Sequence, residues 1–93
     1  MSAGGPQTAS VTSVNASATS VTLMTASARR GGTIFNEGST ILYIAFTATA
    51  SVTTYTTQVA VNGYYELPPA TYSGVVSGIW AGSPTGAARV TQW

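Results

Sequence analysis

The chain has 93 residues, of which 5% are charged and 44% hydrophobic, and its formal net charge is +1. It contains no His, Cys, Lys or Asp, so it lacks the residue types on which general acid–base catalysis and zinc binding normally depend. Two Glu are too few for a Ca²⁺ or Mg²⁺ site, and three Arg are too few for the phosphate contacts of a nucleic-acid-binding protein. We therefore expect no enzyme, no cofactor, no metal and no nucleic-acid partner.

The length predicts a single domain with a modest core. Without disulfides or a metal, oligomerisation is the remaining source of extra stability. A surface rich in Ser and Thr and poor in charge suits a protein that packs against copies of itself or against partner chains. No stretch is apolar for the 18 or more residues that a membrane-spanning helix needs, and residues 1–6 do not resemble a signal peptide. We expect no membrane partner.

Residues 1–12 are mostly Gly, Ser, Ala and Thr, with almost no bulky side chain. Such a segment cannot offset its ordering entropy by burial. It is expected to be a flexible arm, or an arm that lies along a neighbouring subunit as an added strand. Residues 13–93 then form the single β domain.

From residue 20 onward, β-branched and aromatic residues dominate, and no window has helical periodicity. Turn residues recur every 8–12 residues or so, which is typical of an all-β, antiparallel sandwich or small barrel. Gly74 and Gly78 indicate bulges or close backbone approach within one strand. About seven strands are predicted, over Ser20–Met24, Thr33–Asn36, Thr40–Thr47, Tyr55–Val61, Tyr64–Leu67, Tyr72–Trp80 and about Ala87–Gln92.

Asn62-Gly63 lies between two of these predicted strands. The pair is a strong signal for a two-residue hairpin with a type I′ turn, in which both central residues need φ > 0. It predicts that Tyr55–Val61 and Tyr64–Leu67 pair with each other.

The segment Ile41–Phe46 is apolar on both faces. It is either a central strand covered on both sides or a strand whose second face packs against another subunit. Because only one sheet face can be covered internally in a chain this small, and an uncovered apolar strand would aggregate, this segment favours an oligomer.

Several residues are candidates for an interface. Arg29 and Arg30 either have an ordinary local role, solvated in a loop or paired with Glu37 or Glu66, or meet an acidic surface on a larger assembly. Tyr64, Tyr65 and Trp80 are possible binding anchors, with one Tyr in the core and its neighbour exposed, and Trp93 is expected to pack against something. The complete candidate interface is Arg29, Arg30, Tyr43, Tyr64, Glu66, Trp80, Arg89 and Trp93.

The order of several segments resembles small virion proteins of tailed bacteriophages. The run Arg29–Asn36 is similar to an R-R-G-A-T-I-Y-N opening in that family, with Gly32 in place of Ala and Phe35 in place of Tyr. Later landmarks follow in matching order from about Ser20 to Thr91. They are Leu42-Tyr43-Ile44, Gly63-Tyr64-Tyr65-Glu66-Leu67-Pro68, Gly78-Ile79-Trp80-Ala81 and Gly86-Ala87-Ala88-Arg89-Val90-Thr91.

The resemblance implies a structural component of a virion, made in the host bacterial cytoplasm. The favoured role is decoration of the capsid surface, where a homo-oligomer, with a trimer as the favoured state, contacts the major capsid protein or another virion protein. A base or adaptor protein of a tail or head fibre is one alternative. A carbohydrate-binding module for receptor recognition is another.

Overall fold

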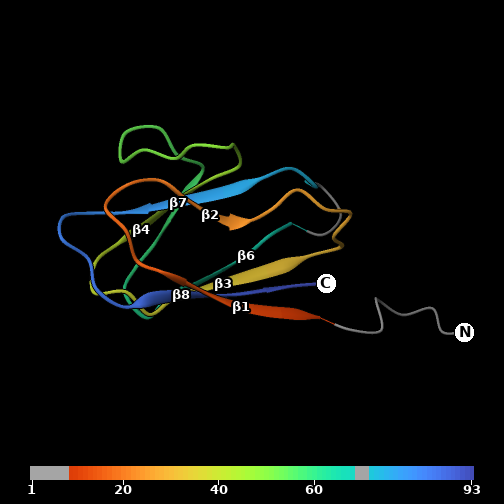
Figure 1. Ribbon diagram of the computed structural model, residues 1–93, viewed down its shortest axis with the longest axis horizontal. Coiled ribbons are helices and arrows are strands. Elements are labelled where there is room, and N and C mark those ends of the chain that lie inside the picture. Colours follow the sequence, from red (N-terminus) through yellow and green to blue (C-terminus); the bar gives the residue numbers. More distant parts are fainter. Residues whose placement is uncertain (1–8, 69–71) are drawn as a thin grey trace, which may run out of the picture.

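The computed structural model describes residues 9–68 and 72–93 of the chain. This part folds into two packed antiparallel sheets with no helix, as Figure 1 shows. The predicted β-sandwich is therefore confirmed. The strands are β1 (Ser10–Asn15), β2 (Val21–Met24), β3 (Gly32–Asn36), β4 (Leu42–Ala45), β5 (Thr57–Val59), β6 (Tyr64–Glu66), β7 (Val76–Trp80) and β8 (Ala87–Gln92).

The strand order is that of an eight-stranded jelly roll. Sheet A has the order β1-β8-β3-β6 and sheet B the order β2-β7-β4-β5. The first strand pairs with the last, β2 with β7, β3 with β6, and β4 with β5. These pairings are those of one long hairpin that has been rolled up. Rolling adds the β3–β8 and β4–β7 ladders, which join neighbouring turns of the roll.

The hairpin predicted at Asn62-Gly63 is wrong, because β5 and β6 lie in different sheets. The two residues instead form the crossing from sheet B to sheet A. Asn62 has a φ of 64° and Gly63 is not in the positive-φ region, so this is not a type I′ turn. Main-chain bonds of Asn36 hold the crossing in place: its N–H donates to Gly63 O, and its carbonyl accepts from Asn62 N.

Strand β1 comes in addition to the predicted strands and includes the last residues of the expected arm. Residues Ser10–Thr12, which were expected to belong to the arm, pair with β8 of the same chain. The expected boundary at residue 12 therefore falls inside a strand. Residues 1–8, the rest of the expected arm, lie outside the described residues.

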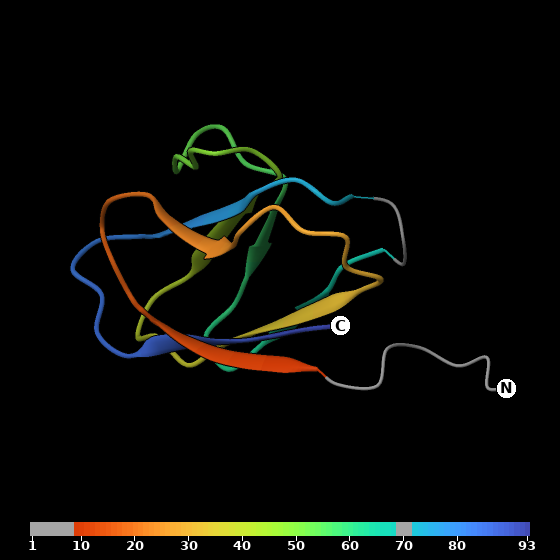
Figure 2. The same cartoon turned by 45° about the vertical axis from the view of Figure 1, so that its right-hand side comes forward.

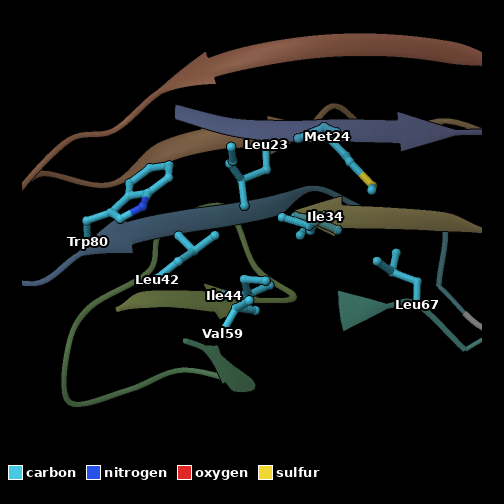
Figure 3. Close-up of a cluster of buried hydrophobic side chains, with 11 residues drawn as sticks. Leu23, Met24, Ile34, Leu42, Ile44, Val59, Leu67 and Trp80 are labelled. Carbon is cyan, nitrogen blue, oxygen red and sulfur yellow. The ribbon is translucent and has the colours of Figure 1, made fainter. Parts of the chain in front are cut away.

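The core lies between the two sheets, where alternate residues of each strand meet (Figure 3). Leu42 and Ile44 of β4 face the same layer as Trp80 of β7, and all three are at most 1% exposed. Gly78 marks a close approach, as predicted, because an added Cβ would lie 2.7 Å from Leu23 Cδ1. The buried cluster comprises Leu23, Met24, Ile34, Leu42, Ile44, Val59, Leu67, Val76, Trp80, Ala88 and Val90.

The second face of β4 is covered by the chain itself. Ala45 is 4% exposed although it points away from the core between the sheets. The loop of residues 46–56 rises on that side, and Figure 2 shows it projecting beyond β4 and β7. Its Tyr55 ring packs on Tyr43, with centroids 4.8 Å apart, and Ser20 Oγ accepts a hydrogen bond from Ala50 N. Tyr43 and Ala45 on this face are thus covered within the chain, whereas Ile41 on the same face is 38% exposed.

Candidate functional site

The outer face of sheet A carries three predicted interface residues, Tyr64, Glu66 and Arg89, and all three are exposed. On β3 and β8, Ile34 and Val90 point into the core and are at most 1% exposed. Because side chains alternate along a strand, their neighbours point outward. The outer face comprises Val11, Ser13 and Asn15 of β1, Ala87, Arg89 and Thr91 of β8, Thr33 and Phe35 of β3, and Tyr64 and Glu66 of β6.

The strand register arranges eight of these ten side chains in two rows across the sheet. The first row runs through Ser13, Arg89, Phe35 and Tyr64, and the second through Val11, Thr91, Thr33 and Glu66. Side chains directly opposite each other on adjacent strands lie about 4.5–5.5 Å apart at Cβ. The face therefore places an aromatic pair, Phe35 and Tyr64, next to the guanidinium-bearing strand β8.

Tyr64 and Arg89 are the most prominent members of the first row. The Tyr64 side chain is 68% exposed, whereas its neighbour Tyr65 is partly buried against the core, so the predicted split between the two Tyr is confirmed. Arg89 Nε donates to Glu37 Oε1 over 2.6 Å in an ion pair between exposed side chains. Exposed pairs of this kind contribute little to stability, about 0–1 kcal/mol. The ion pair instead holds the Arg89 guanidinium beside the Glu37 carboxylate.

Arg29 is a buried structural residue, which neither of the two predicted roles anticipated. It is 8% exposed, and its guanidinium donates to Gln92 Oε1 and to three main-chain carbonyls. Burial lowers the pKa of Arg29, and its charge interaction with Tyr72 opposes that shift. Four of its five N–H groups are occupied by these bonds. The carbonyls belong to Thr25, Tyr72 and Gly74.

The remaining candidates are scattered over the molecule. Trp80 is 1% exposed in the core, so the folded chain does not present it as a surface anchor. Tyr43 lies on the opposite sheet under Tyr55. Trp93 is half-buried, and its ring lies about 3.0 Å from where a Cβ of Gly31 would be. Arg30 is exposed, and its N–H donates to Trp93 O.

Sheet A thus brings together three of the eight predicted residues, Tyr64, Glu66 and Arg89. Sequence reasoning missed Phe35, which lies between Arg89 and Tyr64 in the first row. The alternation of Ile34 with Phe35 was a usable signal, since the two must lie on opposite faces. Both are apolar, however, so the pattern does not say which of them faces the core.

A hollow of about 310 Å³ lies at the end of the sandwich, where Ala9, Ser27, Gln92 and Trp93 surround Arg29. The Arg29 guanidinium in this hollow is already hydrogen-bonded to Gln92 and to three main-chain carbonyls. Across the described ranges there is no group of three His, Cys, Asp or Glu side chains placed to hold a metal ion. The same residues include no helix long and apolar enough to cross a membrane.

Comparison with protein-family models, curated proteins and solved structures gives no match for this chain. The resemblance to phage virion proteins stays a prediction from the quoted sequence segments.

Proposed function

We propose that the protein is a structural component of a phage virion that docks on the capsid surface through the outer face of sheet A. The observation that carries the proposal is the row of Arg89, Phe35 and Tyr64 on one exposed sheet face. Arg and aromatic residues are enriched in the centres of protein interfaces. This row offers them side by side on adjacent strands.

The chemistry of the chain supports a passive role. A protein without His, Cys, Lys or Asp has few means of acid–base or nucleophilic catalysis. Its low charge lowers the cost of desolvating a surface on docking. Jelly rolls include viral capsid domains but also lectins. Because one fold serves many functions, the strand order is compatible with the proposal and does not select it.

The size of the face sets a requirement for docking. Four strands about 4.8 Å apart, crossed by two rows about 7 Å apart, give a patch on the order of 200–300 Å². A standard interface buries about 800 Å² per partner. The sheet face can therefore supply the centre of an interface, and loops or a further copy of the chain must supply its rim.

The copy number of the chain in purified virions tests the location. Hundreds of copies per particle are expected for capsid decoration. A dozen or fewer would favour the fibre or tail adaptor, and absence from the particle would overturn the proposal.

Binding to capsids that lack the protein tests the surface. Tyr64→Ala is expected to weaken binding by at least about 10-fold, as for an interface hot spot. Tyr55→Ala is the matched control, because Tyr55 is also exposed but lies beside sheet B. Equal binding by both variants would remove the outer face of sheet A from the proposal.

One observation favours carbohydrate binding as a second candidate. The Tyr64 ring is exposed at the edge of a sheet next to Glu66, and exposed aromatic rings can stack on sugars while carboxylates accept bonds from hydroxyls. Glycan-array binding that Tyr64→Ala abolishes would support this candidate. Trp80→Ala is uninformative here, since Trp80 belongs to the core.

A further inference from the structure

We propose that two copies of the chain pair through the free edge of β1, in an antiparallel register centred on Ser13. The pairing would join two sheets A into one continuous sheet across a two-fold axis. This inference rests on main-chain geometry and does not depend on the proposed virion function.

Strand β1 is the margin of sheet A in Figures 1 and 2. Within residues 9–68 and 72–93, β8 is its one paired neighbour. The first four residues of β1, Ser10–Ser13, are all exposed, so neither face of this part of the strand is covered. Val11 is 69% exposed. An incoming strand would therefore meet no side chain of the described residues that covers this edge.

The hydrogen-bond alternation identifies the groups that the edge offers. Ala16 N donates to Gly86 O over 2.9 Å, and this pair continues the register of β1 with β8. In an antiparallel ladder, hydrogen-bonded pairs alternate with non-bonded pairs. The even residues of β1 thus bond to β8. The N–H and C=O groups of Val11, Ser13 and Asn15 point away from the sheet.

The neighbouring ladder confirms this assignment. Trp93 exchanges two main-chain bonds with Gly31, each 3.1 Å long. Odd residues of β8 therefore bond to β3, which leaves the even residues of β8 for β1.

Other edges of the sandwich carry features that discourage pairing, and β1 does not. At the other edge of sheet A, β6 has three residues and carries Glu66. In sheet B, β5 has three residues, and β2 has an irregular register between Thr22 and Met24. Short strands, charges and bulges are the usual means of protecting an edge. Strand β1 has six residues, with no charge, no Pro and no such irregularity.

A second copy of β1 is a complementary partner for this edge. When Ser13 lies opposite Ser13 of the partner copy, Val11 lies opposite Asn15 of the partner copy and the reverse pair follows by symmetry. All three pairs use the outward groups, which gives about six main-chain hydrogen bonds. If the pairing is centred one residue away from Ser13, about four main-chain hydrogen bonds remain between the two strands. Since the strand is uncharged, no like charges meet across the axis.

The two-fold axis of this pairing stands perpendicular to the sheet. Both outer faces then lie on the same side, and the row of Arg89, Phe35 and Tyr64 is repeated across the axis. Such a dimer would double the area of the exposed sheet face. A two-fold pair is the state that this edge supports, in place of the trimer expected from the sequence.

Single-cysteine cross-linking tests both the dimer and its register, because the chain has no Cys of its own. With Ser13→Cys, the two substituted positions lie directly opposite each other, with Cα atoms about 5.5 Å apart, within the range of a disulfide. Val11→Cys is the matched control on the same face. Its two copies would lie about 14 Å apart, although Val11 is highly exposed.

We expect a covalent dimer from Ser13→Cys under mild oxidation and at least about 10-fold slower cross-linking of Val11→Cys. Equal rates would mean random collision and would overturn the register. Sedimentation of the unmodified chain at concentrations up to about 1 mM would detect even millimolar association. A monomer throughout that range would overturn the dimer.

Two substitutions at Ser13 provide a second test without oxidation. Ser13→Pro removes a donor that points away from β8, so the chain's own ladder is kept and the dimer is lost. Ser13→Lys places two like charges opposite each other and should weaken the dimer as well, even if the Pro variant folds poorly. Dimerisation of the folded Lys variant with unchanged affinity would contradict the pairing.

Discussion

Trp80 Nε1 donates a hydrogen bond of 3.0 Å to Asn36 Oδ1, and both residues are almost fully buried. The bond joins β7 of sheet B to β3 of sheet A across the core. Gly38 N donates to the same oxygen over 2.8 Å. The amide nitrogen of Asn36 donates to three main-chain carbonyls, those of Thr40, Val59 and Ala60. Asn36 is thus a satisfied polar centre inside an apolar sandwich.

Asn36→Asp should destabilise the fold strongly at pH 7. The substitution keeps the shape but aims a carboxylate at three carbonyl oxygens, which we expect to cost about 3–5 kcal/mol. Burial and these oxygens raise the pKa of the new carboxyl above the unfolded value of about 3.9. The loss should therefore be smaller at pH 4 than at pH 7. Urea unfolding at both pH values measures this, with Asn36→Ala as a control whose loss is independent of pH. Equal losses for the Asp variant would contradict it.

Two glycines with positive φ offer a matched comparison. Gly86 has a φ of 90°, and an added Cβ would overlap the carbonyl oxygen of Glu37. Gly82 has a φ of 63°, and an added Cβ would meet open space. We expect Gly82→Ala to cost about 1 kcal/mol for the left-handed backbone alone. Gly86→Ala should cost at least about 2 kcal/mol more, because the backbone must also shift. Thermal unfolding checks the order, and similar melting temperatures would refute it.

Arg29 and Arg89 allow the stability contribution of a buried arginine to be compared with that of an exposed one. Arg29→Ala removes the donor from three carbonyls near the end of the sandwich, at an expected cost of about 2–4 kcal/mol. Arg89→Ala removes an exposed ion pair and should cost about 0–1 kcal/mol. Chemical denaturation of both variants gives the comparison. A larger loss for Arg89→Ala would show that Arg29 contributes little.

The loop of residues 46–56 should depend on Tyr55 for its position. The Tyr55 ring packs on Tyr43, and its hydroxyl accepts a bond of 2.8 Å from Gln58 Nε2. Tyr55→Ala should cost about 1 kcal/mol or less but accelerate amide hydrogen exchange within the loop. Exchange in β8, in the other sheet, serves as the internal control. Uniform acceleration in both regions would indicate global loss of stability instead of local opening.

The sequence was informative wherever a local pattern had one structural solution. Alternating β-branched and aromatic residues located seven strands, because that pattern fits a half-buried sheet. Strand β1 escaped notice because Ser10–Asn15 buries little on either face. Its strand conformation depends on the β8 ladder, whose residues lie about 75 positions further along the chain.

The pairing partners could not be predicted from local signals. Asn62-Gly63 favours a hairpin, but in the structure β6 joins β3 and not β5. The buried Asn36 explains part of this outcome, because its main chain holds the crossing and its side chain binds the β5 end. A single polar residue within an apolar strand gave no sign of that role. Local signals likewise predict a surface charge at Arg29, because its carbonyl partners come from two distant segments, at Thr25 and at residues 72–74.

The pairing of the first strand with the last has a consequence for synthesis on the ribosome. Translation proceeds at roughly 5–20 residues per second, so β1 exists for several seconds before its partner β8 has been made. During that interval its main-chain groups on both sides are open to other chains. Nascent copies translated side by side from one messenger RNA would present identical uncharged strands at high local concentration, which makes the timing of β8 emergence important for correct folding.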